Sequence, residues 1–277
     1  GFRPGDVIVA SSFATSTNNV NWVVSAVGTT TMDVIDTAAA STTEAAASGP
    51  DVALVGRRID IGSTLTTVTL ERQFDDVSQY QPFRGVAIDQ MSISVSPEAI
   101  VGGTFSLVGM SMGAMAATSV SASAAAAAAT NEPFAAFDGG LYENGVLTAV
   151  VTSIEVTLAN NRTLQAVVGS KFSPDVFEGQ AIVTGTMTVF FEDETLYNKF
   201  FNETASSIWV KLDDNNGTDF MTIVLPNVKY TGGPMDPPQE GPVPLEMPFQ
   251  ALEATVDGPS STTVDTSLSI QVSNVPA

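Results

Sequence analysis

The feature that most constrains the fold of this chain is a two-residue alternation of apolar and polar side chains that recurs along its length. In the run MSISVS (91–96) every second residue is apolar and the residues between are serines. Runs 153–158, 183–189 and 267–273 repeat the pattern. Because successive side chains of a β-strand point to opposite faces, these runs predict half-buried strands. Their polar faces, mostly hydroxylated, suit contact with water or with a neighbouring subunit.

Turn signals separate these strand-like runs. They are NNG at 215–217, TGGP at 231–234 and DGP at 257–259. Many strands joined by such turns, with little helical periodicity, predict an all-β sandwich or barrel.

One segment departs from the strand pattern. In DETLYNKFFNET the residues Leu196, Tyr197, Phe200 and Phe201 form a helical stripe, and Asp193 stands where an N-cap belongs. We expect one short amphipathic helix over about 194–203, laid on a sheet; the alternative is an aromatic-rich loop.

Two low-complexity segments bear on the organisation of the chain. Residues 36–51, rich in Ala, Ser and Thr, separate the first strands from everything after Arg57. We therefore expect a small N-terminal β module over 1–56 and a β-sandwich domain over 57–277. The Ala-rich stretch 121–130 is consistent with a short helix or with a flexible loop.

An internal similarity links two parts of the sequence. SPEAIVGGTFSLVGM (96–110) resembles SPDVFEGQAIVTGTM (173–187), which indicates two related strand-loop-strand units side by side in one sheet. Chance similarity between two β connections is the alternative. Four glycines of these units are candidates for close backbone approach or bends, although a core-only role is equally open: Gly102, Gly109, Gly179 and Gly185.

Composition excludes several classes of chemistry. The chain has no Cys and no His, so thiolate nucleophiles, zinc fingers and imidazole bases are absent. Ten Lys and Arg oppose 30 Asp and Glu, and the formal net charge of −20 repels nucleic acid and anionic membranes. With 44% hydrophobic and only 14% charged residues, the chain is not typical of disorder. No apolar run approaches the roughly 20 residues of a membrane-spanning helix, so we expect a soluble protein.

Three patterns in the sequence offer residue types that catalytic or metal sites use. GMSMG around Ser111 matches the nucleophile-elbow motif, but no histidine base exists to activate a serine. Asp213, Asp214 and Asp219 offer oxygen ligands for Ca²⁺, yet their spacing fits no EF-hand, and a tight turn explains them better. Paired acids at 75–76 and 192–194 suit glycoside hydrolysis only if they face each other. We expect no active site, no metal and no cofactor.

The few cations are the remaining candidates. Arg57, Arg58, Arg72 and Arg84 are followed by Lys171, Lys199, Lys211 and Lys229 in the second half. They are either partners of carboxylates on a neighbouring copy or ordinary solvated charges. Arg72, Arg84 and Lys199 are retained as assembly candidates.

Three segments together resemble a known family. They are ERQFDDVSQYQPFRGVAIDQMSISVSPEAIVGGTFSLVGM, SIEVTLANNRTLQAVVGSKFSPDVFEGQAIVTGTMTVFFEDETLYNKFFN and IVLPNVKY. Their succession is similar to the tail tube proteins of bacteriophages with long non-contractile tails, over most of residues 59–277. The segment GDVIVASSFATSTNNVNWVVSAV resembles a small β module found in several phage tail proteins.

The resemblance implies a structural virion protein, the major tail tube subunit, that assembles in the host cytoplasm into stacked rings and conducts DNA. The implied partners are further copies in commonly hexameric rings, the tape measure protein, other tail proteins and DNA in passage, with no membrane. Six copies at −20 each bring about 120 negative charges to one ring, which would keep DNA from adhering. The internal similarity leaves open a trimer with two tube-like halves. The alternative function is a surface or secreted β-sandwich adhesin or binding module.

Overall fold

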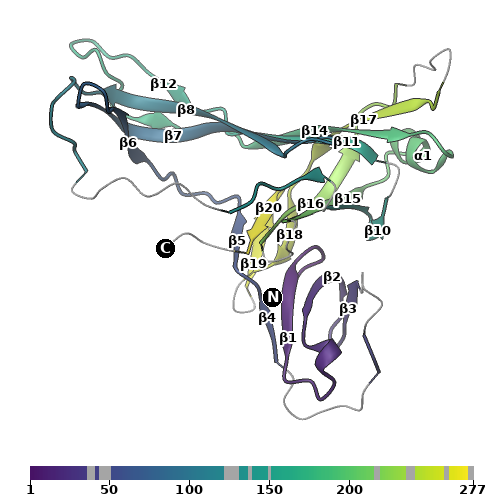
Figure 1. Ribbon diagram of the computed structural model, residues 1–277. Helices are drawn as coiled ribbons and strands as arrows, with labels where there is room; N and C mark the ends of the chain where they lie inside the picture. The colour runs from purple at the N-terminus through teal and green to yellow at the C-terminus, as the bar shows by residue number, and fades with distance from the viewer. Residues whose placement is uncertain are drawn as a thin grey trace.

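A computed structural model describes residues 1–35, 41–43, 51–121, 131–136, 139–148, 151–214, 219–234, 241–258 and 262–273. The described residues form β-strands, one α-helix and one short 3-10 helix (Figure 1). The prediction of an all-β protein with one short helix is therefore confirmed. The low-complexity residues 36–40, 44–50 and 122–130, and the turn residues 215–217, lie outside the described residues.

The N-terminal segment forms its own four-stranded antiparallel sheet in the order β3-β2-β1-β4. Ile8, Trp22 and Val24 form a small buried cluster on it. This is the small N-terminal β module that the sequence predicts, whereas the boundary at residue 56 remains a prediction. Its elements are β1 (Val7–Ser11), η1 (Ser16–Asn18), β2 (Asn21–Val27), β3 (Met32–Ile35) and β4 (Asp51–Leu54).

The remaining chain forms a twelve-stranded antiparallel sheet and two small hairpins. The strands of the large sheet are β5 (Arg57–Asp60), β6 (Val68–Phe74), β7 (Gln79–Val95), β8 (Gly102–Met112), β9 (Gly140–Glu143), β10 (Val146–Leu147), β11 (Val151–Ala159), β14 (Ile182–Phe190), β15 (Ser206–Asp213), β16 (Phe220–Tyr230), β17 (Pro244–Ala251) and β20 (Ser269–Val272). The hairpins are β12 (Thr163–Leu164) with β13 (Val176–Phe177), and β18 (Ala254–Asp257) with β19 (Thr263–Thr266).

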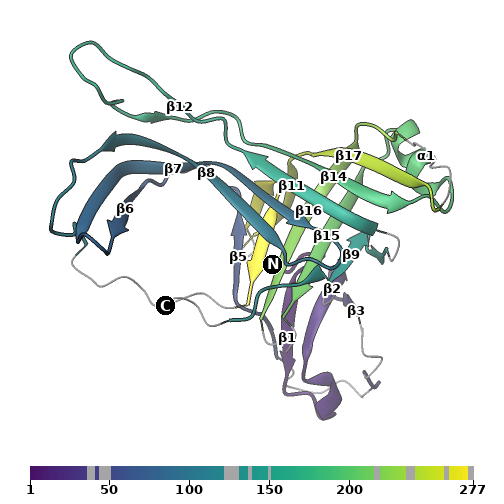
Figure 2. The ribbon, with the colours of Figure 1, turned by 45° about the horizontal axis from the view of Figure 1, so that its top comes forward.

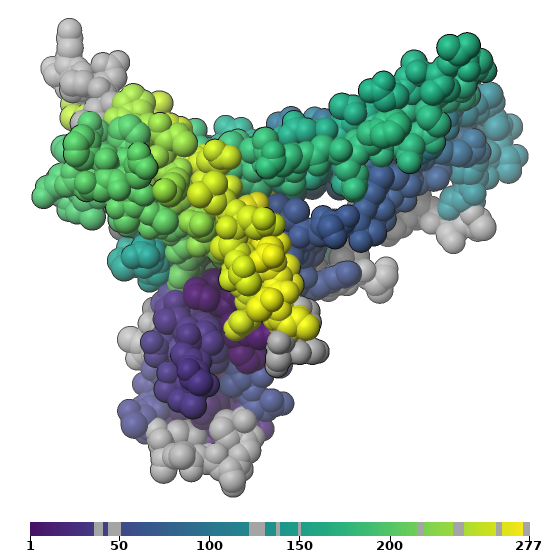
Figure 3. Space-filling model, turned by 180° about the vertical axis from the view of Figure 1, so that it is seen from behind, coloured from purple at the N-terminus to yellow at the C-terminus, as the bar shows by residue number. Residues whose placement is uncertain are grey.

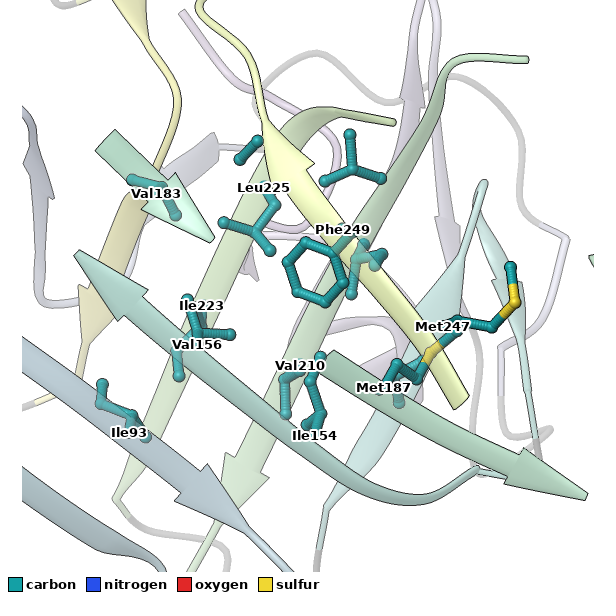
Figure 4. Close-up of a cluster of buried hydrophobic side chains, with 14 of the residues drawn as sticks. Ile93, Ile154, Val156, Val183, Met187, Val210, Ile223, Leu225, Met247 and Phe249 are labelled. Carbon is teal, nitrogen blue, oxygen red and sulfur yellow. The ribbon is translucent and has the colours of Figure 1, made fainter. Parts of the chain in front are cut away.

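Strand β16 folds the large sheet into two layers, because its two ends pair with different strands. Residues Met221–Val224 pair with β20, and residues 228–230 pair with β17. One layer contains β7, β11, β14 and β17; the other contains β9, β15, β16, β20 and β5. The strands of the two layers cross in the views of Figures 2 and 4.

The main hydrophobic core lies between these layers. Met187 and Phe249 from the first layer, with Leu225 and Val210 from the second, belong to one cluster of buried side chains (Figure 4). The apolar residues of the alternating runs in β7, β11 and β14 supply much of this core, including Ile93, Ile154, Val156 and Val183. Alternation thus predicts correctly which face of these strands is buried.

In β20 the same reasoning is wrong. Ser269 and Gln271, predicted on an outer face, are buried, with exposed fractions of 4% and 2%. The N-terminal segment covers that face, as the contacts of these two side chains show below. A polar face is therefore also an internal face here.

The two similar sequence units occupy adjacent places in the large sheet. Strands β7 and β8 form one antiparallel pair, β11 and β14 form another, and β11 pairs with β7. The resulting order β14-β11-β7-β8 confirms the expected side-by-side arrangement.

The predicted helix is α1 (Thr195–Phe201). The N-cap of this helix is Glu194, which makes no side-chain cap hydrogen bond, so the prediction of Asp193 as N-cap is wrong by one residue. The Asp193 carboxylate nevertheless accepts a hydrogen bond of 2.8 Å from the Thr195 backbone N–H, which lowers the pKa of Asp193. Leu196, Tyr197 and Phe200 pack against the main core, whereas Phe201 is 73% exposed. The apolar stripe of the helix therefore covers the sheet as predicted, except for its last residue.

Candidate assembly surface

A long arm projects from the two-layered body. It contains β6, the first half of β7 and the second half of β8, and the segment 160–181 with β12 and β13 follows it outward (Figures 1 and 3). Strand β7 belongs to both parts: residues 90–95 pair with β11 in the body, and residues 79–86 pair with β6 in the arm. Because one continuous strand joins them, the arm is anchored in the main sheet.

Many exposed large apolar side chains gather on this arm. A soluble monomer rarely leaves a large contiguous apolar patch in water, so such a concentration indicates a contact surface. The exposed residues on β6, β7, β8 and their connections are Val68, Leu70, Val77, Ile88, Phe105, Leu107, Met112, Met115 and Val120. The neighbouring segment adds Leu164, Val167, Val168, Phe172 and Phe177.

The arm also ends in open strand edges. β8 pairs with β7 from Gly102 to Met112, and no described strand pairs with its other edge. In the described residues β6 likewise pairs only with β7. A long unpaired edge presents free N–H and C=O groups that another chain can complete.

The structure separates the three cations that the sequence retained as candidates. Arg72 and Arg84 are exposed on the arm, in β6 and β7, and neither forms an ion pair with any described residue. The Arg72 guanidinium lies 4.7 Å from the centre of the Phe74 ring. Lys199 differs, because its ammonium nitrogen lies 2.6 Å from Glu143 Oε1 of the same chain. The carboxylate that pairs with Lys199 in this structure therefore belongs to the same chain and not to a neighbouring copy.

The Lys199–Glu143 pair is part of a buried polar cluster beneath α1. Ser206 Oγ donates to Glu143 Oε1, and the Tyr230 hydroxyl donates to the same oxygen at 3.3 Å. Burial and the Glu143 carboxylate strongly raise the pKa of Tyr230, so the phenol stays protonated. Glu143 is thereby held by three donors, and α1 is tied to β9, β15 and β16.

A second polar cluster fastens the N-terminal module to the body. Arg3 Nη1 lies 2.7 Å from Asp60 Oδ1, and Arg58 Nη1 lies 2.7 Å from Asp6 Oδ2. Burial raises the pKa of Asp6 more than the two arginines lower it. For Asp60 burial is outweighed by hydrogen bonds from Arg3 and Ser269 and by the arginine charges, so its pKa is lowered. The paired charges cross between the module and β5.

Gln271 completes this junction. Its side-chain Oε1 accepts a 2.8 Å hydrogen bond from the Val7 N–H, and its Nε2 donates to Val7 O at 2.8 Å and to Val55 O at 2.6 Å. Beside it, Val7 and Val23 of the module share a buried cluster with Trp209 and Val224 of the body. Sequence analysis did not predict this junction, because its partners lie up to 266 residues apart in the chain.

The outer face of the first layer is polar, and the side chains that β7, β11, β14 and β17 present on it include no Lys or Arg. Lys229 of β16 stands opposite Gln250 at the border of this face. We call this outer face the hydroxyl face. Register aligns Ser94, Glu155 and Thr186 in one row, and Ser92, Thr157, Thr184 and Gln250 in the next. The residues of the face are Gln90, Ser92, Ser94, Ser153, Glu155, Thr157, Thr184, Thr186, Thr188, Glu246, Pro248 and Gln250. The formal charges among these residues are the two glutamates, and Lys229 adds one positive charge at the border.

Comparison with known proteins decides the family. A family model described as "Phage tail tube protein" matches residues 6–265. The chain belongs to the phage tail tube protein family. No curated protein matches the chain. A solved structure of the SPP1 tail tube, from solid-state NMR and cryo-EM, is 10% identical and covers 65% of this chain and 77% of that one, with a TM-score of 0.25 too low to carry an argument.

As a tail tube protein the chain is a structural component of the virion tail. No helix in its described residues has both the length and the apolar character needed to cross a membrane. Among the same residues no group of three or more acids gathers as a metal site. Of the acids considered for Ca²⁺, Asp213 is bound by Lys211 at 2.6 Å, and the Asp214 N–H donates to the Asp219 carbonyl at 2.9 Å. The two acid pairs considered for hydrolysis are on different elements, because residues 75–76 follow β6 on the arm and residues 192–194 precede α1. Ser111 lies in β8, away from any strand-to-helix turn.

In this tail tube protein the four candidate glycines lie in different surroundings. A Cβ at Gly185 would collide with the Glu155 carbonyl oxygen and the Phe249 ring, and one at Gly179 with the Asn161 carbonyl oxygen. At Gly102 and Gly109 the nearest atoms belong to side chains, at 3.1 and 3.3 Å. Close approach of backbone and ring thus explains the first two glycines; an assembly role for all four stays a prediction.

Proposed function

We propose that this chain is the major tail tube subunit, that copies self-assemble into stacked rings of six, and that the rings form a channel through which DNA passes. The tape measure protein and other tail proteins are its further partners, and assembly takes place in the host cytoplasm. Family membership supports the structural role. The different chemical character of the hydroxyl face and of the arm supports the channel and the self-assembly.

The observation that carries the proposal is the hydroxyl face. DNA carries one negative charge per about 1.7 Å of helix axis and binds proteins chiefly where Lys and Arg neutralise its phosphates. Four adjacent strands here present hydroxyls, amides and two glutamates, Glu155 and Glu246, and the one cation that the register places beside them is Lys229, opposite Gln250 at the border. Such a wall hydrates well and offers phosphates a single cation at its border, as a channel for moving DNA requires.

Net charge works in the same direction. At −20 per chain, six copies bring about 120 negative charges to one ring, and the field inside a closed wall of one sign repels DNA from all sides. Repulsion between copies must then be overcome at short range. The exposed apolar side chains and open edges of the arm supply that attraction.

The experiment uses accessibility in assembled tubes. The chain contains no Cys, so Thr184→Cys on the hydroxyl face gives a single thiol, and Ser11→Cys in β1 is a matched control. Negative-stain microscopy establishes whether purified protein forms tubes. We expect Thr184→Cys tubes to react with a small maleimide but not with a maleimide carried on a polyethylene glycol chain of about 20 kDa, because the large reagent does not enter the closed channel. Ser11→Cys tubes should react with both reagents.

Two results would count against the proposal. Equal reaction of both variants with the large reagent would place the hydroxyl face outside the channel. A monomer that persists at high concentration, with no rings or tubes, would refute self-assembly and favour a binding module.

A further inference from the structure

An apolar groove lies on the arm. It has a volume of about 470 Å³ and is lined by residues from three strands and from the segment between β12 and β13. Leu107 and Met112 in this lining are 47% and 53% exposed. The principal apolar lining residues are Leu70, Phe83, Leu107, Met112 and Phe172.

Cations flank this groove closely. Arg84 stands opposite the lining residue Ser111 in the β7–β8 register, the Lys171 ammonium lies 5.1 Å from the centre of the Phe172 ring, and Arg72 is two residues along β6 from Leu70. All three are exposed, and none forms an ion pair with any residue that the structure describes. The one acid adjacent to this lining, Glu71, is occupied by hydrogen bonds from Ser119 Oγ and the Val120 N–H. The groove is therefore apolar with a positively charged rim.

The end of the molecule opposite the arm carries α1 (Figures 1 and 2). Its exposed side chains are complementary to those of the groove. Around α1 three phenylalanines are exposed: Phe190, Phe191 and Phe201. The acids Glu192, Asp193, Glu194 and Glu203 are exposed beside them. The nearest cation, Lys199, is already bound by Glu143. We call this surface the α1 end; it is aromatic with a negatively charged rim.

We propose that the arm groove of one copy receives the α1 end of a second copy, so that phenylalanines enter the groove and the acids face Arg72, Arg84 and Lys171. This contact rests on the proposed function and names the surfaces through which copies join. The groove and the α1 end are different surfaces at opposite ends of one chain, so the contact is head-to-tail, and repetition gives a ring or a helical filament. Charge complementarity orients the two surfaces, and apolar burial holds them.

Disulfide trapping tests the contact directly, because the chain has no cysteine of its own. Ser111→Cys, a nearly isosteric change in the groove lining, is mixed with Asn202→Cys, which follows α1. Ser11→Cys in β1 replaces Ser111→Cys in the control mixture. We expect oxidation to give a mixed dimer with Ser111→Cys and none with Ser11→Cys, since a disulfide needs Cα atoms within about 7 Å.

Charge reversal provides a second readout. Arg72→Glu with Arg84→Glu should reduce tube formation at least about tenfold, and Glu192→Lys with Glu194→Lys should do the same. The two sets combined should restore it, because opposite charges again face each other. Asp33→Lys with Asp51→Lys, exposed acids of the N-terminal module, is the control and should leave assembly unchanged.

The outcomes separate this contact from the proposed function. Tubes that form with no mixed disulfide and no effect of the charge reversals would refute the contact and leave the tube function standing. Failure of the wild-type chain to assemble, with no mixed disulfide, would refute both.

Discussion

The junction between the N-terminal module and the body depends on one buried side chain, Gln271. Replacing it by Met preserves its length and removes its three hydrogen bonds. Val7 O keeps a bond from the Val55 N–H at 3.1 Å, whereas the buried Val7 N–H loses the partner that the structure gives it. An unsatisfied buried donor costs about 1–3 kcal/mol, and the lost bond to Val55 O adds about 0.5–1.5 kcal/mol. We expect the free energy of unfolding to fall by about 2–4 kcal/mol.

The two tryptophans allow this loss to be localised. Trp22 is buried in the module and Trp209 in the body, so Trp22→Phe and Trp209→Phe backgrounds report each part separately in urea. With a slope of about 2–3 kcal/mol per molar urea, the expected midpoint shift is about 1 M. The shift should be at least as large for Trp22 as for Trp209.

The control is Gln250→Met, an exposed position on the hydroxyl face that should change stability by less than about 0.5 kcal/mol. If Gln271→Met behaves like this control, the side chain does not hold the module on the body, and the reasoning from its hydrogen bonds fails.

Two further changes follow from the same structure. Gly185→Ala should lower the free energy of unfolding by about 2–4 kcal/mol, because the new Cβ meets the Glu155 carbonyl oxygen and the Phe249 ring. The control is Gly62→Ala, whose new Cβ has nothing within 4 Å. It should change the free energy of unfolding by less than about 1 kcal/mol in the same urea titration. Asp60→Asn should lower the Tm most at neutral pH. Since the pKa of Asp60 is lowered from 3.8 by folding, its contribution is full above that value and is lost in acid, so the Tm gap to wild type should narrow between about pH 5 and pH 2; a constant gap would contradict this.

The local pattern of apolar and polar residues was sufficient to predict much of the fold. Alternation in β7, β11 and β14 predicted both the strands and their buried faces, and the aromatic stripe predicted α1 to within one residue at its start. These features depend on neighbours within a few positions, so they can be derived from the sequence. The side-by-side units were also predictable, because similar segments impose similar pairings.

The candidate assembly surface was harder to predict from the local sequence pattern. Arg72 and Arg84 could be singled out only as rare cations, and Lys199 looked equivalent to them until Glu143 was found beside it. The arm itself gave no distinct signal, because the strands that build it have the same composition as strands that build the core. Exposure, not residue type, distinguishes Phe105 and Leu107 from Ile154 and Val156.

The sequence by itself determined that the chain forms antiparallel strands with one short helix, that it carries a large excess of negative charge, and that it lacks cysteine and histidine chemistry. The tertiary structure alone decided which polar faces are internal, which cations remain free and which apolar faces remain uncovered. The physical reason is that burial and ion pairing depend on residues brought together from distant parts of the chain. The polar side of β20 is internal only because Val7 and Arg3 lie against it.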